Sequence, residues 1–291
     1  MLTTAVLIAG PTASGKSRLA MEIAEACDGV IVNADSMQVY STLRVLTARP
    51  SPDEEARIPH HLFGHVHPSQ SYSVAHWLTD VEQTVREIGK RPVVFVGGTG
   101  LYFRALIEGL SAMPDIPPPL RQKWRQALID DGAPALHRVL SERDPLAAAR
   151  LRPNDGQRIV RALEVVDVSG RSILDWQGGR STPLVDSESA RKLVLAPDRE
   201  TLRRNIDQRF DQMIDAGAMD EVREIVALDL PASLPAMKAI GVRDLAEVLR
   251  GDADLPEAIA HAMAATRQYA KRQDTWFRNQ LGPDWERVHP Q

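Results

Sequence analysis

Short apolar runs rich in β-branched residues recur along the chain, and each is followed by turn residues and then by a helical pattern. The runs cover residues 5–9, 30–32, 93–96 and 193–195. Strands that alternate with helices in this way are typical of a parallel sheet covered by helices. The hydrophobic pattern therefore predicts an α/β protein.

An amphipathic segment that begins at Lys16 follows the first run. Its apolar positions fall on one helical face: Leu19, Ala20, Ile23, Ala24 and Cys27. Side chains spaced by three and four residues line up along a helix. We therefore expect this helix to pack on the sheet.

Residues 113–189 follow a different pattern. The proline-rich sequence PDIPPPLR opens this segment and GGRSTPLVDSES closes it, and helical patterns without a strand-like run lie between them. Loops of this composition are typical of domain boundaries. The sequence thus predicts a helical insertion domain at 113–189, within an α/β core formed by residues 1–112 and 190–291.

Composition narrows the classes of function. The formal net charge of −4 argues against a generally basic nucleic-acid-binding protein, although it allows a local basic surface. With Cys27 as its single cysteine, the chain cannot form an internal disulfide, so a reducing compartment is expected. No segment has the roughly 18 apolar residues of a membrane span, nor the pattern of a signal peptide. We expect a cytoplasmic protein without membrane contact and, by default, a monomer.

The sequence GPTASGKS, residues 10–17, directly follows the first apolar run. Its spacing is that of a phosphate-binding loop, G-x-x-x-x-G-K-[ST]. Gly10 and Gly15 allow backbone N–H groups to turn toward an anion, and the helix N-terminus adds partial positive charge. Lys16 supplies a charge to terminal phosphates, and the Ser17 hydroxyl is placed to bind Mg²⁺. The loop predicts a P-loop NTPase-like core.

The second and third runs bring further polar residues to the same edge, because ligands bind beyond the carboxyl ends of parallel strands. NADSMQVY places Asp35 there, and GGTGLY places Thr99 there. In a phosphoryl-transfer enzyme Asp35 would hold a metal ion or act as a base; alternatively it only caps the following helix. The third run ends without an acid, and no residue clearly positions a water. We therefore expect group transfer rather than hydrolysis.

Six motifs in order along the chain resemble those of the tRNA dimethylallyltransferase family. They are GPTASGKS, NADSMQVY, IPHHL, VGGTGLYFRAL, RPNDGQRIVRALEV and AKRQDTWFR. The resemblance covers nearly the whole chain and is far more specific than the phosphate loop alone. Members of this family prenylate the adenosine immediately 3′ of the anticodon.

The resemblance implies that the loop holds the diphosphate of dimethylallyl diphosphate rather than ATP. The binding residues would be Gly10, Thr12, Ala13, Ser14, Gly15, Lys16 and Ser17. Lys16 and Mg²⁺ would stabilise the charge on the departing diphosphate. Asp35 would accept a proton from the exocyclic amine of a flipped-out adenine, and Thr99 would hydrogen-bond the reacting groups.

The same resemblance implies contacts with the anticodon stem-loop of tRNA. The residues would be Asp35, Ser36, Met37, Gln38, Thr99, Arg121, Gln157, Arg158, Ile159, Val160, Arg161, Lys271 and Arg278. Within the insertion, Asn154 or Asp155 is expected to cap the helix that carries Arg158 and Arg161. Its apolar residues are expected to face a core: Ile159, Val160 and Leu163.

A basic patch is expected near the C-terminus. Arg267, Lys271 and Arg278 recur at spacings of four and seven, so they can line one helical face toward phosphates. A solvated surface helix is the alternative. Trp276 and Phe277 are expected to pack into the core.

Histidines cluster in HHLFGHVH, residues 60–67, but no cysteine or acid completes a metal-ligand set. We interpret PHHL as a structural element near the substrate. Two residues depart from the family pattern: Arg49 stands where a lysine is frequent, and Val242 where a tyrosine is usual.

Two other functions are compatible with these residues. A P-loop kinase of a nucleotide or small metabolite would use the insertion as a lid and ATP as the donor. A noncatalytic RNA-binding protein would bind tRNA without turnover.

Overall fold

The computed structural model describes residues 2, 4–179 and 181–290. The chain divides into two compact units, Met1–Ile107 with Pro183–Gln291, and Glu108–Thr182. The first unit contains the sheet, and the second contains helices that pack on one another.

The boundaries of the second unit fall several residues before the expected positions 113 and 189. Val185 and Ala190 are buried in the core of the first unit, so the chain has rejoined that unit well before residue 189. At the other boundary, Leu110 accepts a hydrogen bond from the Ser181 backbone N–H at 2.7 Å and donates one to the Ser181 hydroxyl at 3.1 Å. This pairing joins the two connecting segments ahead of residue 113.

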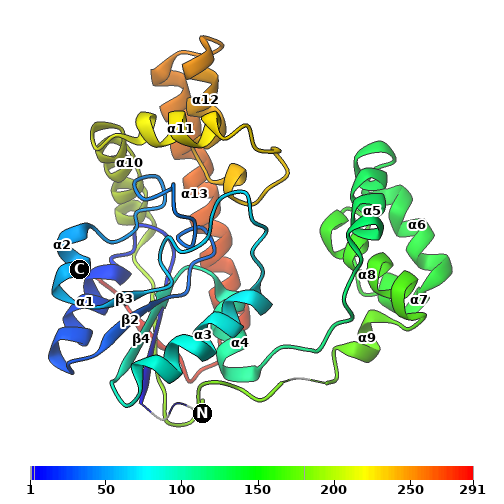
Figure 1. Ribbon diagram of the computed structural model, residues 1–291, viewed down its shortest axis with the longest axis horizontal. Coiled ribbons are helices and arrows are strands. Elements are labelled where there is room, and N and C mark those ends of the chain that lie inside the picture. The colour runs from blue at the N-terminus through cyan, green and yellow to red at the C-terminus, as the bar shows by residue number, and fades with distance from the viewer. Residues whose placement is uncertain (1, 3, 180, 291) are drawn as a thin grey trace. The chain divides into compact units, whose positions relative to one another are not determined.

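The first unit is built on a six-stranded sheet in the order β3-β2-β4-β1-β5-β6 (Figure 1). Neighbouring strands are parallel throughout, which confirms the predicted α/β class. The strands are β1 (Ala5–Ala9), β2 (Val30–Asn33), β3 (His60–His61), β4 (Val93–Gly97), β5 (Arg191–Leu195) and β6 (Glu286–Val288).

The four predicted strands are confirmed, and the two edge strands are additional. β3 has two residues and β6 has three, and neither is buried. Such short, polar segments carry no apolar run that a sequence pattern could identify. They form because an adjacent strand offers its backbone groups for pairing.

One face of the sheet is covered by α1 (Lys16–Ala26). Ala20, Met21 and Ala24 of this helix pack against apolar residues of the strands. The helix packs on the sheet as expected. At the end of the helix, however, the buried residues differ from those predicted. Cys27 lies just past the last helical residue and is exposed, whereas Met21 is buried.

The opposite face is covered by α3 (Val74–Ile88), α4 (Gly100–Glu108) and the C-terminal half of α13 (Leu255–Gln280). Trp77 stacks on Tyr102 with ring centroids 4.1 Å apart, which joins α3 to α4. Phe277 is buried and Trp276 packs against the same cluster, as the sequence predicted.

A second apolar cluster contains the chain that follows β2 and β5. Residues 37–48 contribute several members, among them Tyr40 and Leu43, and most of the others come from helices. These helices are α10 (Arg199–Asp215), α11 (Ala218–Ala227), the 3₁₀ helix η1 (Ala236–Lys238), α12 (Val242–Arg250) and the N-terminal half of α13. The short helix α2 (Pro52–Arg57) follows residues 37–48 and contains no buried residue. Val242 is buried in this cluster, so it serves packing.

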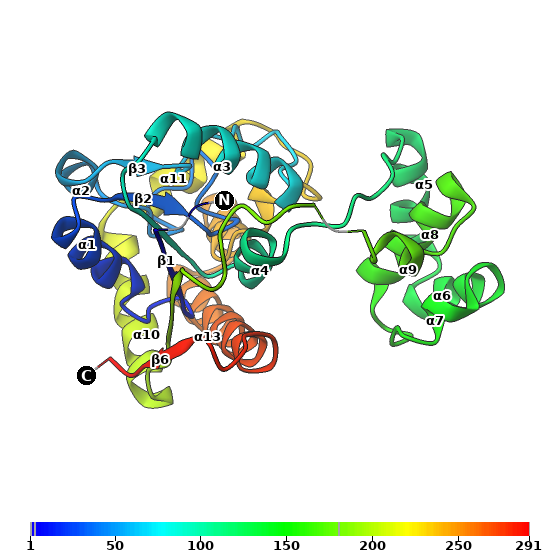
Figure 2. The same cartoon turned by 90° about the horizontal axis from the view of Figure 1, so that it is seen from below.

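The second unit has its own apolar core around Trp124, Leu140, Ile159 and Leu163. Its helices are α5 (Pro118–Asp130), α6 (Ala133–Arg143), α7 (Pro145–Ala148), α8 (Gly156–Ser169) and α9 (Ile173–Trp176). α8 contacts both α5 and α6 (Figure 2). Among the described residues of both units, no helix combines the length and the apolar character that crossing a bilayer requires.

Candidate functional site

The loop between β1 and α1 is held in a conformation that needs its glycines. Gly15 has a φ of +86°, a left-handed value that side chains rarely adopt. A Cβ atom on Gly10 would lie 2.8 Å from the Ser14 hydroxyl and 3.1 Å from Leu195. The loop leads directly into the first turn of α1, whose N–H groups have no partner within the helix. The arrangement is suited to binding an anion.

Two polar side chains of this loop are poorly satisfied by the protein itself. Ser14 is buried, and its hydroxyl has no hydrogen-bond partner. The Lys16 ammonium lies 3.3 Å from the Pro11 carbonyl. Burial lowers the pKa of Lys16 to about 8, against the opposing effect of the Asp35 carboxylate and with a smaller contribution from the charge of Arg209. A bound anion would supply what both groups lack.

The tips of β2 and β4 bring Asp35 and Thr99 together. The Ser36 backbone N–H donates to the Thr99 hydroxyl at 2.9 Å, and the Thr99 hydroxyl lies 3.2 Å from that of Ser36. Asp35 accepts a hydrogen bond from the Met37 backbone N–H at 2.9 Å. A Cβ atom on Gly98 would lie 3.0 Å from the second Asp35 oxygen, so the glycine permits this close approach.

Asn33 fixes the backbone of Asp35. The fully buried Asn33 side chain accepts from the Asp35 N–H at 2.8 Å and donates to the Asp35 carbonyl at 3.0 Å. The side chain also donates to the Leu62 carbonyl at 3.0 Å, and the backbone carbonyl of Asn33 accepts from the Trp77 indole at 2.9 Å. Asn33 therefore holds both the N–H and the carbonyl of Asp35, which fixes the backbone that carries its carboxylate.

Arg209 of α10 joins this group, and the sequence analysis did not identify it. Its guanidinium donates to the Thr12 hydroxyl in the glycine loop. Burial lowers the pKa of Arg209 to about 10, and the charge of Asp35 opposes that shift. Arg209 could have been identified from the sequence by its position beside Ile206 and Phe210, apolar residues of the same helix that are buried.

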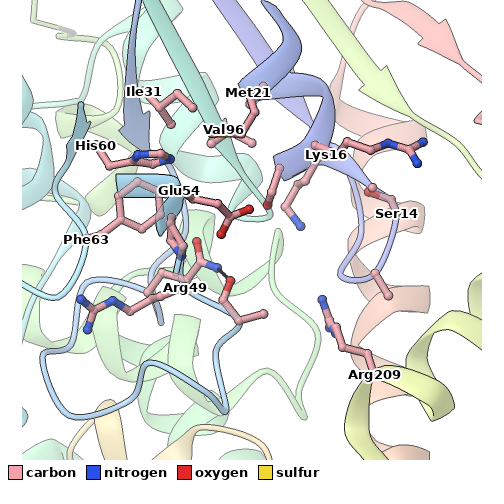
Figure 3. A pocket seen from close by; sticks show the side chains of 18 of the residues that line it. Ser14, Lys16, Met21, Ile31, Arg49, Glu54, His60, Phe63, Val96 and Arg209 are labelled. Atoms are coloured by element: carbon pink, nitrogen blue, oxygen red, sulfur yellow. Dashed lines mark hydrogen bonds between the residues drawn. The ribbon is translucent and has the colours of Figure 1, made fainter. Parts of the chain in front are cut away.

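The glycine loop borders a cavity of about 630 Å³. Ser14, Lys16 and Arg209 lie on one side of it, and Glu54, His60 and Phe63 lie on the other (Figure 3). The cavity therefore combines four cationic side chains (Lys16, Arg18, Arg49 and Arg209) with a carboxylate and apolar groups.

A second cavity, of about 330 Å³, is lined by Asp35, Ser36 and Met37. Arg209 lines both cavities, and Thr12 of the glycine loop lines the second. Apolar residues of α10, Tyr269 of α13 and the cations Lys238 and Arg272 are also part of its wall. Burial together with the charge of Asp35 raises the pKa of Tyr269, so this phenol stays protonated. The carboxylate thus faces a cavity that adjoins the anion loop.

The other expected RNA-contacting residues of the first unit are distributed as follows. Gln38 lines the larger cavity and donates to the carbonyls of Thr47 and Ala48 at 2.8 and 2.9 Å. Lys271 is exposed on α13, and Arg278 is exposed and pairs with Asp274 at 2.9 Å. Arg267 pairs with Asp207 of α10 and so, like Arg278, shares its charge with an acid.

In the second unit, Gln157 and Arg158 are exposed on α8, and Arg161 pairs with the buried Glu164 at 3.2 Å. Arg121 lies in the first turn of α5. The side chains of Ile159 and Val160 are buried in the core of this unit, as their periodicity predicted. They are consequently not available as RNA-contacting side chains.

Asp155 is the N-cap of α8, although its side chain makes no capping hydrogen bond. It pairs with Arg158 at 3.1 Å instead. The predicted position of the cap is thus correct, but its expected side-chain interaction is wrong.

Two further sequence features have structural partners. His60 bonds the Ile58 carbonyl at 2.8 Å and belongs to β3; in the described part of the chain no group of three metal-ligating side chains is assembled. Arg49 donates to the carbonyls of Tyr40 and Ser41 at 3.2 and 2.9 Å, which ties the loop that ends there to the residues after β2.

Comparisons with known proteins show the family of this chain. A family model described as IPP transferase matches residues 38–280, and one described as isopentenyl transferase matches residues 3–59. The chain is 62% identical, over 290 residues and 99% of each chain, to the tRNA dimethylallyltransferase of Chelativorans sp..

Two solved structures are similar along nearly the whole chain. The full-length tRNA isopentenylpyrophosphate transferase from Bacillus halodurans is 32% identical, with a TM-score of 0.69 over 99% of this chain and 90% of that one. A eukaryotic dimethylallyltransferase acting on tRNA is 27% identical, with a TM-score of 0.80 over 97% of this chain and 71% of that one.

Proposed function

This chain belongs to the IPP transferase family, and we propose from that membership and the site above how its residues divide the work. The enzyme is a tRNA dimethylallyltransferase. It transfers the dimethylallyl group of dimethylallyl diphosphate to the exocyclic amine of the adenosine 3′ of the anticodon, and diphosphate leaves. The observation that carries the assignment of roles is the closeness of the anion loop to the carboxylate that follows β2: the charge of Asp35 acts on Lys16, and Asp35 and Thr12 line the same cavity.

In this proposal the glycine loop binds the diphosphate and gives the core its P-loop NTPase-like character. The ligands are backbone and side-chain groups of Gly10, Thr12, Ala13, Ser14, Gly15, Lys16 and Ser17. The unsatisfied Ser14 hydroxyl and the low pKa of Lys16 support this role, because each gains a partner when an anion is bound. Lys16 and Arg209 then stabilise the negative charge that grows as the allylic C–O bond breaks.

The donor set at the loop fits a Mg²⁺ ion. Ser17 lies in the first turn of α1 and borders the larger cavity, which Glu54 also lines. Mg²⁺ typically takes one or two protein oxygens together with substrate phosphates and waters. We propose that Ser17 holds it, and that the bound ion would add charge neutralisation at the diphosphate.

Asp35 is proposed as the general base. The adenine amine is a weak nucleophile until a proton is accepted as the new N–C bond forms. The amine's electron pair makes the bond to the allylic carbon, the C–O electron pair leaves with the diphosphate, and Asp35 takes the proton. Thr99, fixed by Ser36, hydrogen-bonds the reacting groups. The adenine must leave the base stack of the tRNA to reach the cavity beside Asp35. Enclosure in that cavity keeps water from the allylic carbon.

Further RNA contacts are proposed for exposed and half-buried residues of both units: Gln38, Arg121, Gln157, Arg158, Arg161, Lys271 and Arg278. We propose that the protein acts as a monomer, since all the groups named for catalysis belong to one chain, and that it acts on tRNA in the cytoplasm.

One assay separates the transferase from a kinase. The protein is incubated with tRNA, Mg²⁺ and either dimethylallyl diphosphate or ATP, and digested nucleosides are analysed by mass spectrometry. We expect a dimethylallyl adduct on adenosine only with the first donor. A phosphorylated product that requires ATP would overturn the assignment.

The pH dependence of dimethylallyl diphosphate use should report Lys16. The pKa of this group is lowered to about 8, so its charge is present below pH 8 and is lost as the pH rises through that value. Since kcat/KM reports the free enzyme, we expect kcat/KM for dimethylallyl diphosphate to fall above about pH 8. A constant kcat/KM between pH 7 and 9.5 would contradict this role.

The salt dependence of tRNA binding should report Arg161. Replacing it alone leaves the buried Glu164 without its ion-pair partner, which destabilises the unit. The comparison is therefore between R161A/E164Q and E164Q. We expect the slope of log K against log salt to be smaller in the double variant by roughly 0.7–0.9, as for one lost phosphate contact. Equal slopes would exclude the contact.

A further inference from the structure

The side chain of Gln273, on α13, connects the two loops of the site. Its carbonyl oxygen accepts a hydrogen bond from the Thr12 backbone N–H at 2.9 Å, in the glycine loop. Its amide nitrogen donates to the Gly98 carbonyl at 2.9 Å, in the turn that carries Thr99. Gln273 is only 6% exposed, so these bonds are shielded from water.

Close packing of α13 on this turn holds the amide in place. A Cβ atom on Gly98 would lie 2.2 Å from the Gln273 nitrogen, and one on Gly100 would lie 2.1 Å from the Trp276 ring. The two glycines thus let the helix approach the backbone of the turn. The helix cannot shift toward the turn, and the amide of Gln273 fills the remaining space between the loops.

We propose that Gln273 is a positioning residue that fixes the distance between the loop holding the leaving diphosphate and the turn beside the nucleophile. The inference rests on the proposed function. Thr12 belongs to the anion-binding loop, and Gly98 precedes Thr99 and adjoins Asp35. A shift of either loop changes the separation between the allylic carbon and the amine. A misplacement of about 1 Å is enough to lower a rate by about 100-fold.

The chemistry of glutamine is specific for this position. One end of a primary amide accepts and the other donates, which matches an N–H on one side and a carbonyl on the other. An ionised carboxylate can satisfy only Thr12 and repels the Gly98 carbonyl. A protonated carboxyl group again accepts at one oxygen and donates at the other.

The test compares Q273L and Q273E with the wild type. Q83L serves as a control, because Gln83 is exposed on α3 and bonds only Glu87 within the described structure. We expect Q273L to lose about tenfold to 100-fold in kcat, with KM for tRNA within about twofold of the wild-type value. Q83L should match the wild type in both.

The pH profile distinguishes positioning from a merely structural role. The ratio of the Q273E rate to the wild-type rate should rise when the pH is lowered from 8 to 6, because protonation restores the donor toward Gly98. Q273L should show no such rise. If Q273L keeps its rate, or if the Q273E ratio is independent of pH, the proposal is wrong.

A readout without substrates separates this inference from the proposed function. In the ligand-free protein, amide hydrogen exchange at residues 10–17 should be faster in Q273L than in Q83L, since the Thr12 N–H loses its acceptor. If exchange is faster in Q273L but the wild-type protein fails to prenylate tRNA, the positioning role of Gln273 is supported and the proposed reaction is rejected. If exchange in Q273L is unchanged and the wild-type protein does prenylate tRNA, only the positioning role is overturned.

Discussion

Replacing Asp35 by asparagine is expected to lower the rate of prenyl transfer by about 10²- to 10⁴-fold, the range that general bases supply. Asparagine has nearly the same shape, and its carbonyl oxygen can still accept the hydrogen bond from Met37 that Asp35 accepts at 2.9 Å. It cannot take the proton of the adenine amine. Single-turnover measurements with saturating tRNA and dimethylallyl diphosphate would isolate this step, because they exclude product release.

The D35N substitution is also expected to shift the pKa of Lys16. The charge of Asp35 raises the pKa of Lys16, which burial lowers to about 8. Without that charge the Lys16 pKa should fall further, so binding of dimethylallyl diphosphate should weaken at a lower pH than in the wild type. Near-normal tRNA affinity and thermal stability would show that the variant is folded. Retention of the transfer rate in D35N would remove Asp35 from the role of base.

The central strands could be predicted because each one is buried on both faces. A strand in this position must be apolar along its length, and β-branched residues favour it, so β1, β2, β4 and β5 stand out from the helical background. The edge strands β3 and β6 depend on a neighbour for their existence. Their formation is a tertiary effect that local composition does not report.

The part of the site that lies at the ends of the strands was predictable for a similar reason. The glycine loop, Asp35 and Thr99 each follow a strand directly, so their position is determined by local sequence and by the parallel order of the sheet. The structure adds the reason why they converge: Gly97 and Gly98 leave no room for side chains, with the Ala34 carbonyl 2.0 Å from a Cβ on Gly97.

Arg209 and Gln273 were not predictable in this way, because they reach the site from helices distant in sequence. Gln273 bonds a residue 261 positions away, and Arg209 one 197 positions away. On a helix, a polar residue on the buried side looks like an interruption of the apolar face. Only the packing of α10 and α13 shows that each is directed at the glycine loop.

Isolated charge spacing was the least reliable guide. The pattern of four and seven residues placed Arg267 with Lys271 and Arg278, but Asp207 on another helix engages Arg267. Whether an arginine is available to a phosphate depends on acids that lie near it in space. Helical periodicity, in contrast, identified the buried side chains of α8 correctly, because burial is decided by the helix's own apolar face.

Replacing Arg209 by methionine is expected to lower kcat by about 10²- to 10³-fold, the loss typical of removing one group that stabilises developing negative charge. Methionine keeps the unbranched aliphatic stem, and it removes both the charge and the hydrogen bond to Thr12. Arg209 lines both cavities, so in the proposed arrangement it would lie where the leaving diphosphate and the allylic carbon separate. The effect should therefore appear in kcat more than in KM for tRNA, measured by steady-state prenylation.

The matched control is R204M, since Arg204 lies on the same helix, is exposed and bonds only the Thr201 hydroxyl within the described residues, at 3.3 Å. A second measurement tests the electrostatic reason. The charge of Arg209 lowers the pKa of Lys16, so in R209M the fall of kcat/KM for dimethylallyl diphosphate should move from about pH 8 to a higher pH. This is the opposite of the shift expected in D35N. If both variants moved the alkaline limb in the same direction, or if R209M and R204M had equal kcat values, Arg209 would not be acting on the diphosphate through its charge.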